Sequence, residues 1–325
     1  MPLAICEKQT ASTAHYFPKK EPDNKGTRPP SKTQDLVLRM LAGGSCGLIA
    51  DSVTNLPLVL QTRKFASDAA KIPATGIVRA AYKLITTEGI RGCYSGFPTV
   101  ACASIIGTGA YCVGSHLTRE ALGEGNAANL AAGYGGQVAG SFFAWTKGSV
   151  ISEIQQAPDT IKDPKFINRG ALKIASLILK EQGALGLYRG FGVQLLNFGT
   201  INGLGEYFSG ILRKTMSGAD TSNRLSLIQE FAINALSWGT ASALTTPFGV
   251  FKLRVQLSGM SQKHFPDSSS LQCAKRVWKN EGVRGLYAGT SARVVAITPR
   301  AALFFTGMPR LFDALCELFN FKIHG

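Results

Sequence analysis

Two arginines lie among apolar residues near the end of the sequence, where they could bind an anion. Arg293, Ala296 and Arg300 occupy positions i, i+3 and i+7, which fall on one face of a helix. Arg300 is the only charged residue between positions 294 and 308. A charge inside such a stretch is costly in lipid, so it is a candidate ligand-binding group by default. The pattern therefore favours Arg300 as the main anion contact and Arg293 as a second one.

Two acids in similar surroundings allow a different interpretation of these arginines. Asp51 is the only charged residue between positions 40 and 62, and Glu206 lies within another apolar segment. Either acid could pair with either arginine only to neutralise it. The sequence alone leaves ligand binding and neutralisation both open.

The residue types needed for catalysis or for a metal site do not occur in suitable arrangements. The 7 cysteines form no CxxC pair and show no metal-ligand spacing with the 4 histidines. Those histidines stand in unrelated contexts, which gives no support for a Ser-His-Asp triad. The sequence therefore predicts a protein that is not an enzyme and that has no cofactor.

The composition is typical of a protein that crosses a membrane several times. Charged residues make up 17% and hydrophobic residues 45% of the 325 residues, and 36 are glycine. The net charge is +15, but the basic residues are scattered along the chain and accompany no nucleic-acid-binding motif. We therefore expect contact with anionic lipid headgroups and no nucleic-acid partner.

Residues 1–35 are polar and predict a disordered extension that lacks the apolar core of a secretory signal.

Six stretches are apolar enough, and about long enough, to be transmembrane helices. They lie at residues 36–63, 97–119, 127–156, 191–214, 226–256 and 290–318. The three long loops between them hold 16 Lys or Arg against 7 Asp or Glu, so these loops should face the more negative side of the membrane. The sequence therefore predicts an all-α membrane protein.

A motif that recurs three times indicates how these helices are organised. The segments EGIRGCYSG, EQGALGLYRG and NEGVRGLYAG place Glu88, Glu181 and Glu281 at intervals of 93 and 100 residues. Each motif follows a short amphipathic segment and precedes an apolar helix. The sequence thus predicts three two-helix repeats, each with a short surface helix, at residues 36–125, 126–224 and 225–325.

Together these features resemble the mitochondrial carrier family. The signature of that family runs Pro-x-Asp/Glu-x-x-Lys/Arg-x-Arg and, after a loop, Asp/Glu-Gly and aromatic-Lys/Arg-Gly. The resemblance covers residues 36–315 and is carried by NLPLVLQTRK, TKGSVISEIQQ and TTPFGVFKLRVQ with the three Glu and Gly motifs. It implies six helices around a central cavity, with the surface helices on the matrix side.

The resemblance implies a gate at the matrix side, where prolines kink the odd-numbered helices and an acid of one repeat pairs with a base of the next. The positions that match are Pro57, Gln61 and Arg63 in the first repeat and Pro247, Lys252 and Arg254 in the third. Glutamine stands here in a lysine place, and the register of the first repeat is uncertain by one residue. In the third repeat, Gly249 stands where the acid is expected.

The second repeat departs furthest from the signature. TKGSVISEIQQ has no proline, and two registers are open for it. Lys147 or Ser149 takes the proline place, and Glu153 or Ser152 takes the lysine place. In one register Glu153 can pair with Lys252, which is the one opposite-charge gate pair that we expect.

A second gate of the family uses an acid and a base three residues apart near the ends of the even-numbered helices. The aligned positions are Ser115 and Thr118, Gly210 and Arg213, and Met308 and Leu311, none of which is an acid. We expect bases near these ends to reach out to the headgroups.

The resemblance also implies where a solute and a lipid bind. The family's substrate contacts map to Ala110, to Asn197 with Phe198, and to Ala296, while Asp51 lies at a level where some members have a cavity-facing residue. Backbone around Gly89, Gly183 and Gly282 is implied to bind cardiolipin phosphates at helix N-termini.

Our leading hypothesis is a carrier that moves a small anionic solute across the mitochondrial inner membrane by alternating access, with antiport as the expected mode. An outer-membrane or peroxisomal location stays open. The alternative is a carrier fold that no longer transports and acts as a structural subunit, membrane adaptor or insertase. We expect a monomer under the first hypothesis and a subunit of a larger membrane complex under the second.

Overall fold

The computed structural model describes residues 31–69, 76–123, 126–157, 165–167, 169–217, 225–258 and 270–319. Most of the expected N-terminal extension, residues 1–30, lies outside the described residues. Its last residues do not continue the extension, because the first helix already begins at Lys32.

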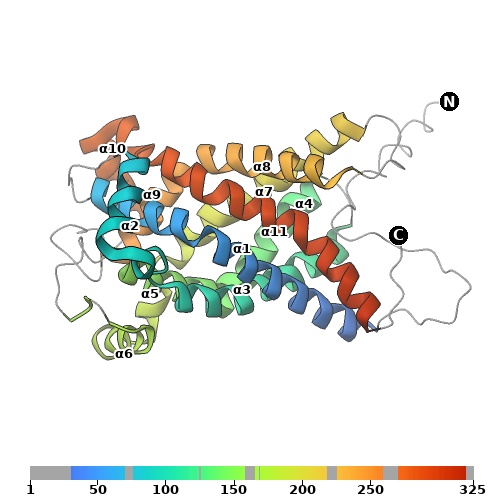
Figure 1. Ribbon diagram of the computed structural model, residues 1–325, viewed down its shortest axis with the longest axis horizontal. Helices are drawn as coiled ribbons and strands as arrows, with labels where there is room; N and C mark the ends of the chain where they lie inside the picture. The colour runs from blue at the N-terminus through green and yellow to red at the C-terminus, as the bar shows by residue number, and fades with distance from the viewer. Residues whose placement is uncertain are drawn as a thin grey trace, which may run out of the picture.

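Six long helical segments form the body of the molecule, and each coincides with a predicted span to within a few residues. They are α1 (Lys32–Ala69), α3 (Phe97–Leu122), α4 with η1 and α5 (Asn126–Gly140, Ser141–Trp145 and Thr146–Gln156), α7 (Phe191–Ser217), α8 with α9 (Leu227–Leu244 and Thr246–Leu257) and α11 (Thr290–Leu318). Figure 1 shows them side by side along the longest axis of the molecule. The described residues contain no β-strand.

Three short helices cover one end of this bundle, as the threefold motif predicts. They are α2 (Ile77–Cys93), α6 (Ala171–Gln182) and α10 (Ser270–Leu286), with the 3-10 turn η2 (Ala184–Tyr188) after α6. Figure 1 shows all three at the end opposite to the start of α1 and the last turns of α11. The motif glycines Gly89, Gly183 and Gly282 turn the chain there with φ of 65°, 69° and 61°, a region that side chains with a Cβ rarely adopt.

The odd-numbered spans differ from one another near the level of the signature prolines. Between α8 and α9 the helix breaks at Thr245, just before Pro247, whereas α1 continues through Pro57. The second repeat has no proline, and a π-helical turn, Ser141–Trp145, stands at the corresponding level. A π turn adds a residue to one turn of a helix and shifts the register of everything after it.

Small residues let the helices approach closely. A Cβ added at Gly43 would lie 2.5 Å from Cys112 Sγ, and one added at Gly47 would lie 2.5 Å from Thr108 Oγ1. One added at Gly136 would lie 2.7 Å from the ring of Tyr111. The pairs of small residues four apart therefore hold α1 and α4 against α3, as is common for helices in lipid.

By length and composition alone, two helices of the described part qualify as membrane spans. They are α1, over Lys32–Ser67, and α3. The π turn and the break at Thr245 divide two of the other spans into shorter pieces.

Candidate functional site

A cavity of about 200 Å³ lies inside the bundle, and every one of the six spans contributes to its lining. It lies between two apolar clusters. One cluster, at the end covered by the surface helices, joins Phe65, Val150, Ile154 and Leu253 of α1, α5 and α9. The other surrounds Trp238, which stacks on Phe305 with ring centroids 3.9 Å apart. The polar lining is thus held between two packed regions of the same bundle.

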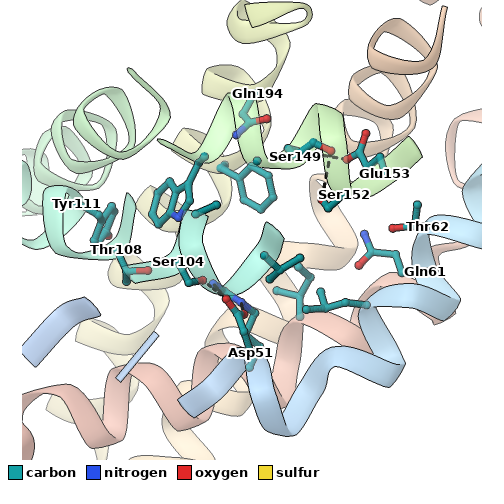
Figure 2. A pocket seen from close by; sticks show the side chains of 18 of the residues that line it. Asp51, Gln61, Thr62, Ser104, Thr108, Tyr111, Ser149, Ser152, Glu153 and Gln194 are labelled. Atoms are coloured by element: carbon teal, nitrogen blue, oxygen red, sulfur yellow. Dashed lines mark hydrogen bonds and ion pairs between the residues drawn. The ribbon is translucent and has the colours of Figure 1, made fainter. Parts of the chain in front are cut away.

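The first charged group in the lining is a pair between α1 and α11. Arg300 Nε donates to Asp51 Oδ1, Arg300 Nη2 lies 3.3 Å from Asp51 Oδ2, and Ser104 Oγ also donates to this carboxylate. The Asp51 side chain is 2% exposed, whereas that of Arg300 is 27% exposed. Both side chains line the cavity, and the acid is the more deeply buried of the two; Figure 2 shows Asp51 beside Ser104 in this lining.

Arg293 lies outside the cavity lining and is 1% exposed. It donates to Ser242 O at 3.1 Å, to Asn197 Oδ1 at 2.8 Å and to Thr245 Oγ1 at 3.2 Å. Two of the residues that sequence analysis assigned to the solute, Arg293 and Asn197, are thus bonded to each other beside the cavity. Their contacts join α11, α7 and the break between α8 and α9.

The same contact gives a reason for the glycine at the third acid position. A Cβ added at Gly249 would lie only 2.3 Å from Arg293 Nη1. The absence of a side chain at Gly249 therefore makes room for the guanidinium.

Glu206, the other acid considered as a partner of these arginines, pairs with a different residue. It lies 3.5 Å from Arg119 Nη2.

The remaining expected contact positions divide between the lining and its surroundings. Phe198 lines the cavity, and Lys252 Nζ lies 5.3 Å from the centre of its ring. Ala110 and Ala296 are outside the lining, and Ala296 is fully buried.

A second charged pair lines the cavity at its other side, between α5 and α9. Lys252 Nζ donates to Glu153 Oε1 at 2.5 Å, and Ser149 Oγ donates to the same oxygen at 2.9 Å. With its amide oriented so that nitrogen faces the acid, Gln256 donates to Glu153 Oε2 at 2.7 Å. The pair expected in one register is therefore present, with Gln61 also in the lining. Its role as a gate stays a prediction.

The other two signature bases point to the surface helices instead of into the cavity. Arg63 holds Glu88 of α2 through two hydrogen bonds of 2.5 and 2.9 Å, and Arg254 holds Glu281 of α10 through two of 2.6 and 2.8 Å. The hydrogen bonds from Arg63 lower the pKa of the Glu88 carboxyl below its ordinary value. In the second repeat, Glu181 pairs with Lys165 at 3.1 Å.

Ion pairs also join the helices at the end of the bundle away from the surface helices. Glu230 of α8 contacts Arg213 of α7 at 3.6 Å and Arg310 of α11 at 2.7 Å. On α1, Asp35 contacts Arg39 at 2.6 Å. Arg213, one of the bases expected to reach out to the headgroups, has an acid on another helix, Glu230, as its partner.

Several lining residues were missed in the sequence analysis. Ser104, Thr108 and Tyr111 of α3 stand at helical spacing along one face, a polar stripe that could have been read from the sequence. Gln137 and Asn202, joined at 3.2 Å, carried no such pattern. Trp145 lies in the π turn, so its position could not be derived from regular helical spacing.

The three glycines expected to bind lipid have open space around them. No heavy atom lies within 4 Å of a Cβ built at Gly89, Gly183 or Gly282, apart from the neighbours along the chain.

Among the described residues no group of His, Cys, Asp and Glu could hold a metal ion.

Comparison with known proteins places these features in a family context. The sequence model of the family described as "Mitochondrial carrier protein" matches residues 32–126 and 223–317. The chain is 25% identical to the mitochondrial substrate carrier family protein E of Dictyostelium discoideum over 298 residues, which covers 86% of this chain and 97% of that protein. It is also 25% identical to the tricarboxylate transport protein A of Danio rerio (86% and 77% covered) and to a mitochondrial S-adenosylmethionine carrier protein of Danio rerio (83% and 94% covered).

Proposed function

Because this chain belongs to the mitochondrial carrier family, we propose that it carries a small solute across the mitochondrial inner membrane through the cavity described above. Its six long helices are the transmembrane helices of that family, and its relatives are mitochondrial transport proteins. The observation that carries the proposal is a polar, charged cavity lined by all six spans at the middle of a membrane protein. Charges in that position are costly, which favours a solute-binding role over a purely structural one.

Arg300 is the main solute contact in this proposal. Its Nε and Nη2 atoms are directed at Asp51, and the part of its side chain that stays exposed faces the cavity. A guanidinium has five N–H donors in a fixed plane, so the remaining ones can hold a carboxylate. Phe198, Gln137 and Asn202 shape the rest of the site. The proposal that the solute carries a carboxylate thus rests on Arg300, since Arg293 is outside the lining.

Alternating access requires that each end of the cavity open in turn. At the matrix end, the contacts that must part are the Glu153 and Lys252 pair and the apolar cluster around Phe65. At the other end they are the stacked rings of Trp238 and Phe305 and the ion pairs of Glu230. Exchange of one solute for another is the mode that we propose.

Membrane lipid is a second proposed partner. The open backbone at Gly89, Gly183 and Gly282 lies shortly before the starts of α3, α7 and α11, respectively. This position supports the proposal that cardiolipin phosphates bind there. We propose that the protein works as a monomer, because the cavity is lined from within a single chain.

The test of this function is uptake into liposomes that contain the purified protein and are preloaded with candidate solutes. Nucleotides, carboxylates, amino acids and inorganic anions form the panel. We expect saturable exchange with at least one class, and a loss of that exchange in Arg300→Gln but not in Arg284→Gln, an exposed arginine of α10. Correctly folded protein that exchanges no solute would instead favour a carrier fold that serves as a structural subunit, adaptor or insertase.

A further inference from the structure

The charges that line the cavity are balanced. Among the described lining residues, the acids are Asp51 and Glu153 and the bases are Lys252 and Arg300. Each acid is bonded to one of the bases, so the lining presents two neutral pairs and no excess of positive charge. A solute with two or three negative charges would therefore meet acids as well as bases, and only part of its charge would be compensated.

The Asp51 and Arg300 pair restricts the solute further. Removing one partner from a buried ion pair is strongly unfavourable, because the other charge is left without compensation. A monoanion that drew Arg300 away would leave Asp51 unpaired at 2% exposure. A monocation that drew Asp51 away would leave Arg300 unpaired in the same way. Neither kind of solute can open the pair at low cost.

We propose that the solute is a small zwitterion with one carboxylate and one ammonium group, such as a neutral α-amino acid. Its carboxylate takes the place of Asp51 on Arg300, and its ammonium takes the place of Arg300 on Asp51. Both buried charges then stay paired while the direct bond between them opens. The cavity of about 200 Å³ is below the size of typical drug-sized sites, which fits a solute of this size.

This replacement also links binding to movement of the helices. Asp51 belongs to α1 and Arg300 to α11, two helices that lie against each other along the bundle. A zwitterion between the two side chains turns a direct link between α1 and α11 into one that runs through the solute. Thr108 follows Ser104 by one helical turn in the lining, and its Oγ1 is buried without a hydrogen-bond partner in the described structure.

The inference rests on the transport function proposed above, so its test separates the two. Three solutes that differ in one charged group each are compared in preloaded liposomes: serine, 3-hydroxypropionate, which lacks the ammonium, and ethanolamine, which lacks the carboxylate. Alanine serves as a second zwitterion, and malate and citrate serve as multivalent anions. We expect exchange of serine or alanine to exceed that of the other four by more than about tenfold.

Variants test the assignment to these two side chains. Asp51→Asn and Arg300→Gln should each lower zwitterion exchange by more than about tenfold, and the double variant Asp51→Arg with Arg300→Asp should recover part of it, because it restores both charges. Glu317→Gln, an exposed acid of α11, is the control. The thermal unfolding midpoint of each variant shows that it is folded.

The outcomes are distinct. The proposal of a zwitterionic solute would be overturned if malate, citrate, 3-hydroxypropionate or ethanolamine were exchanged at or above the rate of the amino acids. The proposed transport function would then still stand. Equal exchange of serine by wild type and both single variants would overturn the assignment to Asp51 and Arg300. No exchange of any solute by folded protein would overturn the transport function itself.

Discussion

At the scale of single residues, Gly249 shows how one missing side chain can make room for another. Its Cβ position is filled by the Arg293 guanidinium, which donates to α7, to α8 and to Thr245 at the break after α8. We expect Gly249→Ala to destabilise the protein by about 1–3 kcal/mol, because the methyl group displaces a buried donor from its acceptors. The thermal unfolding midpoint in detergent measures this.

Gly210→Ala is the matched control for that substitution. Gly210 lies in α7 with no atom within 4 Å of a built Cβ. Alanine is favoured over glycine in a helix by about 1 kcal/mol, so this variant should be neutral or more stable. If Gly249→Ala were stabilised as Gly210→Ala is, the contact with Arg293 would not be the reason for the glycine.

The Glu153 and Lys252 pair gives a second prediction for single residues. Both side chains are largely buried, so Lys252→Gln or Glu153→Gln alone leaves a charge unpaired. Each should cost about 3–5 kcal/mol, and the double variant should cost less than either single one. Unfolding midpoints of the three variants form a double-mutant cycle. Costs that simply add would show that the two side chains do not interact.

At the scale of the elements, the Glu and Gly motif holds each surface helix to its repeat. Arg63 fixes α2 through Glu88 and Arg254 fixes α10 through Glu281, whereas the ion-pair partner of Glu181 among the described residues is the exposed Lys165. We expect Glu281→Gln to lower the unfolding midpoint clearly and Glu181→Gln to have little effect, since exposed pairs contribute little. Equal shifts in both variants would contradict this difference between the repeats.

The Arg63 contact predicts a pH dependence with a definite sign. The pKa of Glu88 is lowered in the folded protein by its hydrogen bonds to Arg63, so the stabilisation is present above the unfolded pKa. It is lost as the pH falls through the folded value. Wild type should therefore unfold at a higher temperature than Glu88→Gln at pH 7, and the difference should disappear in acid below the ordinary value of 4.5. A difference that persisted at low pH would rule out the carboxylate as its source.

How far the sequence could predict these elements depended on regular spacing. The six spans and three surface helices followed from apolar stretches and a repeated motif, because both signals depend on local periodicity. The register of the second repeat did not follow, since this repeat lacks the signature proline and has an irregular turn, the π turn at Ser141–Trp145, just before the signature segment. The place of Arg293 could not be derived either. Its distance from the cavity depends on Gly249 and Asn197, which are far away in sequence.

At the scale of the whole molecule, the cavity lies between two packed regions whose contacts have different chemistry. The end covered by the surface helices joins one ion pair with an apolar cluster, and the other end joins stacked rings with ion pairs around Glu230. A carrier must open these ends in turn, so the relative strength of the two sets of contacts decides which end opens more easily. Weakening one set should therefore shift the balance toward opening at that end.

Glu230→Gln tests this balance, because Glu230 links α8 to both α7 and α11 at the end away from the surface helices. We expect that end to open more often, which exposes Cys46, a buried residue of the apolar cluster around Trp238. The measurement is the labelling rate of Cys46 by a membrane-impermeant thiol reagent, with the other cysteines replaced by serine. Glu317→Gln, which removes an exposed acid near the same end of α11, should leave the rate unchanged. Faster labelling in Glu230→Gln alone supports an end closed by these ion pairs, whereas equal rates in both variants and wild type would show that the stacked rings close it without them.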